Sequence, residues 1–362
     1  MVTLLLCNGY DPNLEMDSPI DRALRSRRWN LFDMLMDWGA APRRVGLSDL
    51  FDAYNSALYE RFRNLGVDLT AHHELAETLA YHTSNKPLFG YARRNRERDP
   101  RMQQELNIAL VHHADEGNEK GIMLCLWAGA DAHAPAMSLR YRDVEEDDDP
   151  EGDENDRFLG FTAIYHACNR GDAEILERLG PDPARDDFDD LYAAARYSTI
   201  VKVLARYALP GDIGEILNSQ LTWITPPFGR TPSLDAIEAV FVVGGRWQTA
   251  TAYQIGSIRR SLLKLPNYTF VDAMKLLARN DHASPEILKQ LGRTPSMRER
   301  MKKVGLIPSP PDLKRPYEQP RPTRAREVRA KFGIEIPKPE ILIQSRISAG
   351  NSYSPTVCVA NS

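Results

Sequence analysis

The chain has 362 residues, of which 42% are hydrophobic and 27% are charged, and its formal net charge is only −4. This length exceeds what one compact domain usually holds, so it predicts an array of repeats or two domains. No apolar run approaches the roughly 20 residues that a membrane helix needs, and residues 2–6 are too short for the apolar part of a secretory signal.

The four cysteines are widely separated along the chain, at Cys7, Cys125, Cys168 and Cys358. They form no pair with two residues between its members, and no histidine stands beside them at the spacing of metal ligands. The pattern predicts free thiols in a reducing compartment. Because no membrane segment is evident either, we expect a cytoplasmic protein without a bound metal or cofactor.

Helical units are indicated from the first residues onward. Residues 4–13 (LLLCNGYDPN) resemble the second helix and exit turn of a helix pair, and a full pair follows at residues 18–42. The clearest unit occupies residues 108–131, where an apolar helical pattern runs on both sides of a Gly-Asn turn. Gly129 is predicted to end its second helix in the left-handed conformation. Helices of about ten residues are unstable alone, so the units must stack.

These units resemble ankyrin repeats, whose pattern TPLHxAxxxGxxxxVxxLLxxGADxN recurs about every 33 residues. Residues 18–21 (SPID) and 162–165 (TAIY) replace the TPLH tetrapeptide, in which Thr caps the first helix and Pro opens it. Residues 9–13 and 129–131 match the exit turn. The resemblance covers roughly residues 1–180 and implies an all-α fold, an α-solenoid of ankyrin-like helix-turn-helix repeats.

The sequence departs from the ankyrin pattern in two ways. No TPLH histidine remains. The glycine spacings are also irregular: 30 residues from Gly9 to Gly39, 27 from Gly39 to Gly66 and 63 from Gly66 to Gly129, the last of which fits two repeats. Helical patterning continues from residue 189 to residue 306, with prolines as breakers, and predicts about seven to nine pairs in all. We therefore expect a repeat domain at residues 1–308 with an acidic loop insertion at residues 138–158.

Beyond residue 308 the chain is basic, proline-rich and polar, which predicts a flexible, largely disordered tail over residues 309–362. From residue 293 to the end, fourteen Lys/Arg and six Asp/Glu give a net charge of 14 − 6 = +8. The rest of the chain therefore carries −4 − 8 = −12. The two parts have opposite charge.

Acidic residues fill ten of the fourteen positions from residue 143 to residue 156, among them Asp147, Asp148 and Asp149. They stand where ankyrin repeats project a hairpin finger, so the resemblance implies a surface loop. The open interpretations are a solvated insert without a ligand, a site for a basic partner, a mimic of nucleic-acid phosphates and a calcium loop. Calcium is disfavoured because Phe158 stands where an EF-hand beginning at Asp147 needs its bidentate glutamate.

Two basic helical segments, residues 297–306 and 324–334, each end in glycine and an aliphatic residue. Clustered cations neutralise phosphates and release counterions, so one interpretation is contact with nucleic acid, although Pro337 and Pro339 interrupt the place of a recognition helix. The alternatives are a last helix that closes the stack and a linear peptide that docks on another protein or on the acidic body. The candidate contact residues are Arg298, Arg300, Lys302, Lys303, Arg326, Arg329 and Lys331.

Two tryptophans occupy equivalent places in their units, since Trp38 and Trp127 stand one and two residues before the glycine that ends the second helix. They are candidate partner-binding anchors if exposed, or packing residues between repeats. The histidine pairs are weak metal candidates, because adjacent helical residues point about 100° apart. We expect His113 to be packed and hydrogen-bonded, and His112 to face outward.

No nucleophile elbow, zinc-protease helix or phosphate-binding loop occurs in the strand-to-helix context that it requires. The sequence therefore predicts a non-catalytic macromolecular interaction protein, an ankyrin-type adaptor or scaffold that binds a protein partner through its repeat surface. The alternatives are a nucleic-acid-associated regulator that uses the basic C-terminal segments and an inhibitor that uses the acidic loop.

Overall fold

The computed structural model describes residues 2–13, 18–139, 160–211, 213–224, 234–279 and 281–306. The chain divides into two units, Met1–Ile307 and Pro308–Ser362, and every described residue belongs to the first. Residues 140–158 of the predicted acidic insertion and the predicted tail, residues 309–362, lie outside the described residues.

The described residues are helical, as predicted: α1 (Val2–Cys7) precedes nine helix pairs. The pairs are α2 (Pro19–Arg25) with α3 (Trp29–Asp37), α4 (Leu47–Asp52) with α5 (Ser56–Asn64), α6 (Glu74–Tyr81) with α7 (Lys86–Asn95), α8 (Pro100–Glu116) with α9 (Glu119–Ala128), α10 (Ala163–Arg170) with α11 (Ala173–Leu179), α12 (Phe188–Ala194) with α13 (Ser198–Leu204), α14 (Gly214–Trp223) with α15 (Asp235–Val242), α16 (Ala252–Lys264) with α17 (Asn267–Ala278), and α18 (Pro285–Leu291) with α19 (Pro295–Lys303). Two short 3₁₀-helices, η1 (Pro42–Arg44) and η2 (Ala71–His73), lie in loops.

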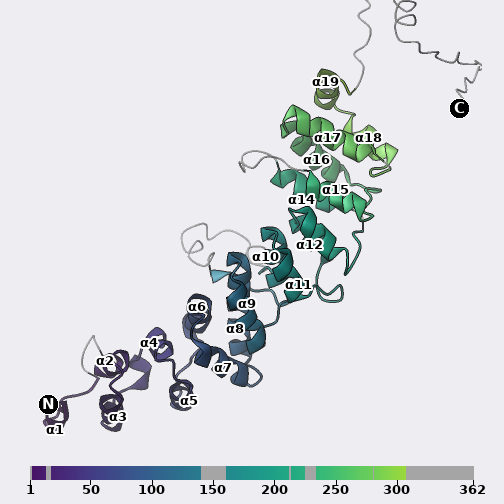
Figure 1. The fold of residues 1–362 in the computed structure, drawn as a ribbon. Helices are drawn as coiled ribbons and strands as arrows, with labels where there is room; N and C mark the ends of the chain where they lie inside the picture. The colour runs from purple at the N-terminus through teal and green to yellow at the C-terminus, as the bar shows by residue number, and fades with distance from the viewer. Residues whose placement is uncertain are drawn as a thin grey trace, which may run out of the picture. The chain divides into compact units, whose positions relative to one another are not determined.

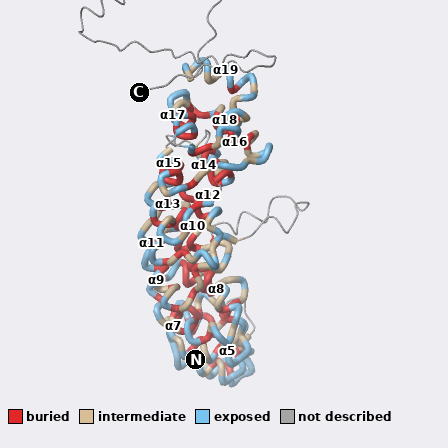
Figure 2. Tube along the Cα trace, turned by 90° about the vertical axis from the view of Figure 1, so that its right-hand side faces the viewer, coloured by how far each residue is buried: buried red, intermediate tan, exposed pale blue. Residues whose placement is uncertain are grey.

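The pairs stack in chain order (Figure 1). The first helices of the pairs form one layer, in which each packs on the next from α2 through α4, α6, α8, α10, α12, α14 and α16 to α18. In the layer of second helices, α5, α7 and α9 pack in succession, as do α11, α13 and α15. One cluster of buried apolar side chains, from Leu6 to Met297, joins all the pairs. Figure 2 shows buried residues along the whole stack. Since each helix is short, this shared burial rather than helix propensity stabilises the stack.

Local signals begin and end the helices much as the sequence predicts. Thr162 caps α10, because its hydroxyl accepts a hydrogen bond from the Tyr165 amide at 3.1 Å. Gly129 ends α9 with φ 94°, which confirms the left-handed cap. The expected cap at Ser18 is wrong: Pro19 opens α2, but the Ser18 side chain makes no cap hydrogen bond. There, proline's fixed φ is the starting signal that remains.

Candidate interaction surface

The single helix α1 and three helix pairs end in the same kind of turn, a glycine followed two residues later by an aspartate. In each turn the aspartate carboxylate accepts a hydrogen bond from the backbone amide two residues further on, which is the geometry of an Asx turn. The bonds are Asn13 to Asp11 at 2.8 Å, Thr70 to Asp68 at 3.0 Å, His133 to Asp131 at 3.1 Å and Ala184 to Asp182 at 2.9 Å. The first and third of these exit turns agree with the turns predicted at residues 9–13 and 129–131. The Gly-x-Asp spacing would have revealed the others.

Arginine side chains from further along the chain contact two of the exit turns. Arg101 contacts Asp68 at 2.6 Å, and Arg185 contacts Asp131 at 2.5 Å. Burial alone would raise the pKa of Asp131, but hydrogen bonds from Arg185 and from the His133 amide hold that pKa below its usual value. The carboxylates of Asp68 and Asp131 therefore link different parts of the stack.

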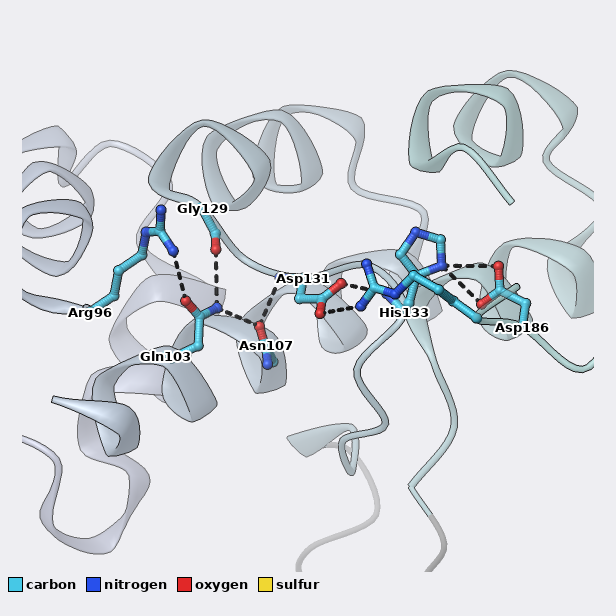
Figure 3. A network of polar contacts seen from close by, with 8 residues as sticks. Arg96, Gln103, Asn107, Gly129, Asp131, His133 and Asp186 are labelled. Atoms are coloured by element: carbon cyan, nitrogen blue, oxygen red, sulfur yellow. Dashed lines mark hydrogen bonds and ion pairs between the residues drawn. The ribbon is translucent and has the colours of Figure 1, made fainter. Parts of the chain in front are cut away.

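A polar network holds the exit turn of α9 from the side of α8 (Figure 3). Gln103 donates to the Gly129 carbonyl at 3.0 Å and to Asn107 at 2.9 Å, and it accepts from Arg96 at 3.1 Å. Asn107 in turn accepts from the Asp131 amide at 2.8 Å. The turn is thus held at both of its ends, Gly129 and Asp131, by side chains of α8.

The same network continues toward the loop after α11. His133 donates from Nδ1 to Asp186 at 2.9 Å, and Asp186 also accepts from the Asp182 amide at 2.8 Å. The Asp186 side chain is only 2% exposed, so this buried contact links the loop after α9 to the loop after α11. Beyond it, an antiparallel bridge pairs Ala136 with Phe161 on the two sides of the acidic insertion. The structure therefore anchors the base of the predicted finger.

Two histidine–carboxylate contacts join neighbouring parts of the stack, one between η2 and α8 and one between α10 and α8. His73 donates to Glu105 at 2.6 Å, and His166 donates from Nδ1 to Asp115 at 3.0 Å. The Ser138 hydroxyl also donates to Asp115, at 3.3 Å. A nucleophilic serine needs its hydrogen bond to the imidazole that removes its proton. Here both groups bond to the carboxylate instead, so this trio serves packing of α8 against α10.

The histidine pair on α8 differs in part from the prediction. His113 is buried, as expected, and its Nε2 donates to the Leu79 carbonyl at 3.1 Å. Burial lowers the pKa of His113 to about 4. The expectation that His112 faces outward is wrong: His112 is 6% exposed, and its ring lies edge-on to Tyr81 at 5.2 Å. The reason is that α6 packs along α8 and covers the side on which His112 lies.

The two candidate tryptophans are both exposed, Trp38 at 45% and Trp127 at 51%. Trp127 lies over α7, where the Arg93 guanidinium stands 4.7 Å from the centre of its ring and Gly90 leaves room for the indole. One turn earlier on α9, Met123 is 46% exposed. The outer side of α7 and α9 therefore presents an aromatic side chain, a thioether and a guanidinium together.

The first basic segment forms α19, but its four candidate residues do not share one environment. Arg298, Lys302 and Lys303 are exposed. Arg300 instead donates to the carbonyls of Leu262, Leu263 and Leu265 at the end of α16, and it lies 4.5 Å from the centre of the Phe270 ring. Its role is thus within the chain, which agrees with the alternative of a last helix that closes the stack.

The remaining candidate residues lie outside the described residues. They are Asp147, Asp148, Asp149, Arg326, Arg329 and Lys331.

Within the described ranges, no helix is long and apolar enough to cross a membrane, and no cluster of three or more histidine, cysteine, aspartate or glutamate side chains could hold a metal ion. No protein-family model, curated protein or solved structure matches the chain.

Proposed function

We propose that the protein is a non-catalytic, ankyrin-type repeat protein that binds a protein partner through the surface of its helix pairs. The ankyrin assignment is supported by the stacked pairs and by the four exit turns, in which a glycine with positive φ precedes an aspartate by two residues. Such stacks offer extended surfaces on which several adjacent units contact one partner. The free thiols of Cys7, Cys125 and Cys168 suit a reducing compartment such as the cytoplasm.

The observation that carries the proposal is the exposure of Trp127. An indole that is half exposed leaves a large apolar area in water, and tryptophan and arginine are the residue types enriched among those that dominate binding energy. Arg93 and Gly90 hold the ring in one place, so little side-chain freedom is lost when a partner covers it. Trp38, at the corresponding end of α3, offers a second anchor.

The test is affinity capture by the full chain in the presence of nuclease, followed by affinity measurement with the captured partner. We expect Trp127→Ala to weaken that affinity by about thirtyfold, the effect of losing roughly 2 kcal/mol at a dominant contact, and Trp38→Ala to weaken it less. Tyr253→Ala is the matched control, because Tyr253 is 72% exposed on the distant helix α16. If the tryptophan variants bind as tightly as this control, the proposed surface is wrong.

The second candidate function is contact with nucleic acid, which the exposed cations Arg298, Lys302 and Lys303 on α19 favour. It requires that the captured material disappear on nuclease treatment and fall steeply as salt rises. Lys302→Glu and Lys303→Glu would then reduce capture, whereas Trp127→Ala would leave it unchanged. A third possibility, inhibition by the acidic loop, requires that deletion of residues 143–156 abolish partner capture.

A further inference from the structure

Positive charge gathers around Trp127 on the outer side of α7 and α9. Lys86, Arg93 and Arg94 are exposed on α7, and the sequence of this helix contains no acidic residue. These three positions share one face of α7, because residues seven and eight apart lie two turns along the same side of a helix. Lys120 is exposed on the neighbouring helix α9. We call this surface the α7–α9 patch.

Two guanidinium groups of the α7–α9 patch lie beside the indole of Trp127. The Cζ atom of Arg93 is 4.7 Å from the centre of the ring. Arg94 and the indole meet over Gly90, since a Cβ atom added to this glycine would stand 3.5 Å from Nη1 of Arg94 and 3.9 Å from Cη2 of Trp127. The absence of a side chain at Gly90 therefore lets one aromatic ring and two cations come together.

The N–H groups of both guanidiniums remain available to a ligand. A guanidinium carries its N–H groups at the edge of its plane, so contact with an aromatic face leaves them free to donate. Within the ranges that the structure describes, Arg93 and Arg94 form no ion pair and donate no side-chain hydrogen bond. These two arginines can therefore bind carboxylates without giving up a contact inside the described chain.

The acidic side chains nearest in the stack are already bound. Glu60 of α5, which packs on α7, accepts a hydrogen bond from Asn95 at 3.1 Å. Glu119 of α9 forms an ion pair with Arg178 at 2.6 Å. Residues 1–292 as a whole carry a net charge of −4 − 8 = −12. The α7–α9 patch is therefore a local positive region on an acidic body.

We propose that the α7–α9 patch binds a short acidic segment of a partner protein, one that also carries an apolar side chain. This inference rests on the proposed function, because it names the partner chemistry of the same tryptophan surface. Carboxylates of the segment accept hydrogen bonds from Arg93 and Arg94, and the apolar side chain covers Trp127 and Met123. Nucleic acid fits less well, because the acidic body would repel phosphates that extend beyond the patch.

The experiment uses the full chain and a fluorescein-labelled peptide, Glu-Leu-Asp-Asp-Leu-Glu. One comparison peptide has the corresponding amides in place of its acidic residues, and another has serine in place of both leucines. Anisotropy titrations should show saturable binding of the acidic peptide, weaker at higher salt, and binding of each comparison peptide that is weaker by about tenfold or more. We expect Arg94→Glu and Trp127→Ala each to weaken binding of the acidic peptide by about tenfold.

Lys202→Glu is the matched control, because it reverses the charge of an exposed cation on α13, which belongs to a different helix pair. Equal loss of affinity in Lys202→Glu and Arg94→Glu would show attraction by net charge alone and would overturn the proposal. Unchanged binding in Arg94→Glu would also overturn it, as would absence of binding by the acidic peptide. Tighter binding of a labelled oligothymidine than of the acidic peptide would assign the patch to nucleic acid instead.

The affinity for the captured partner separates this inference from the proposed function. If Trp127→Ala weakens that affinity and Arg94→Glu does not, the tryptophan surface is correct and the acidic segment is wrong. If neither variant weakens it, both proposals are wrong.

Discussion

Replacing Arg300 with alanine is expected to lower the free energy of unfolding by about 3 kcal/mol and to release α19 from the stack. The Arg300 guanidinium donates to three carbonyls at the end of α16, of which Leu262 is 3.0 Å away, and it stacks on Phe270. Its partial burial lowers the pKa of this guanidinium. Truncation would leave the carbonyls without their donor and would expose the ring.

Urea unfolding measures the loss of stability, and amide hydrogen exchange over residues 295–303 measures the release of α19. Lys302→Ala is the control, since Lys302 is exposed on the same helix. Arg300→Lys should fall between the two, because an ammonium cannot reach several carbonyls in the plane that a guanidinium spans. An Arg300→Ala protein with unchanged unfolding and unchanged exchange would contradict the assigned role.

Replacing His113 with glutamine is expected to remove a pH dependence of stability worth about 3 kcal/mol. His113 has a folded-state pKa of about 4, whereas the ordinary value is 6.5. Between these two pH values the unfolded chain binds a proton that the folded chain does not, so stability falls as the pH is lowered from 6.5 to 4. Glutamine keeps a donor for the Leu79 carbonyl but cannot titrate.

The measurement is the difference in unfolding free energy between the wild type and the variant across this pH range, because the titration of all other groups cancels in that difference. The difference should change by about 3 kcal/mol on going from neutral pH to pH 4. His82→Gln is the control for the substitution itself, since His82 is an exposed histidine. A flat difference for His113→Gln would mean that folding does not lower the pKa of His113.

Much of the fold was predictable because its signals are local. A glycine that adopts positive φ, a threonine that caps the helix after it and an apolar period of 3.6 residues act within a few residues of each other. Gly129 and Thr162 behave as their neighbours in the sequence indicate. The predicted cap at Ser18 is wrong, because the local sequence allows the capping hydrogen bond but does not enforce it.

The candidate surface was predicted only as a set of residue types. The tertiary structure decided that Trp127 lies exposed over Gly90 and Arg93, that His112 is buried beneath Tyr81, and that Arg300 bonds to the end of α16. Each of these outcomes depends on which side of a helix its neighbour covers.

The sequence alone therefore determined the helical class, the pairing of helices and the exit turns, because these depend on residues close together in the chain. Only the tertiary structure decided which polar groups meet across pairs, such as Asp68 with Arg101 and Asp131 with Arg185. The physical reason is that stacking brings together residues more than 30 positions apart, and small differences in helix length and loop length set that register.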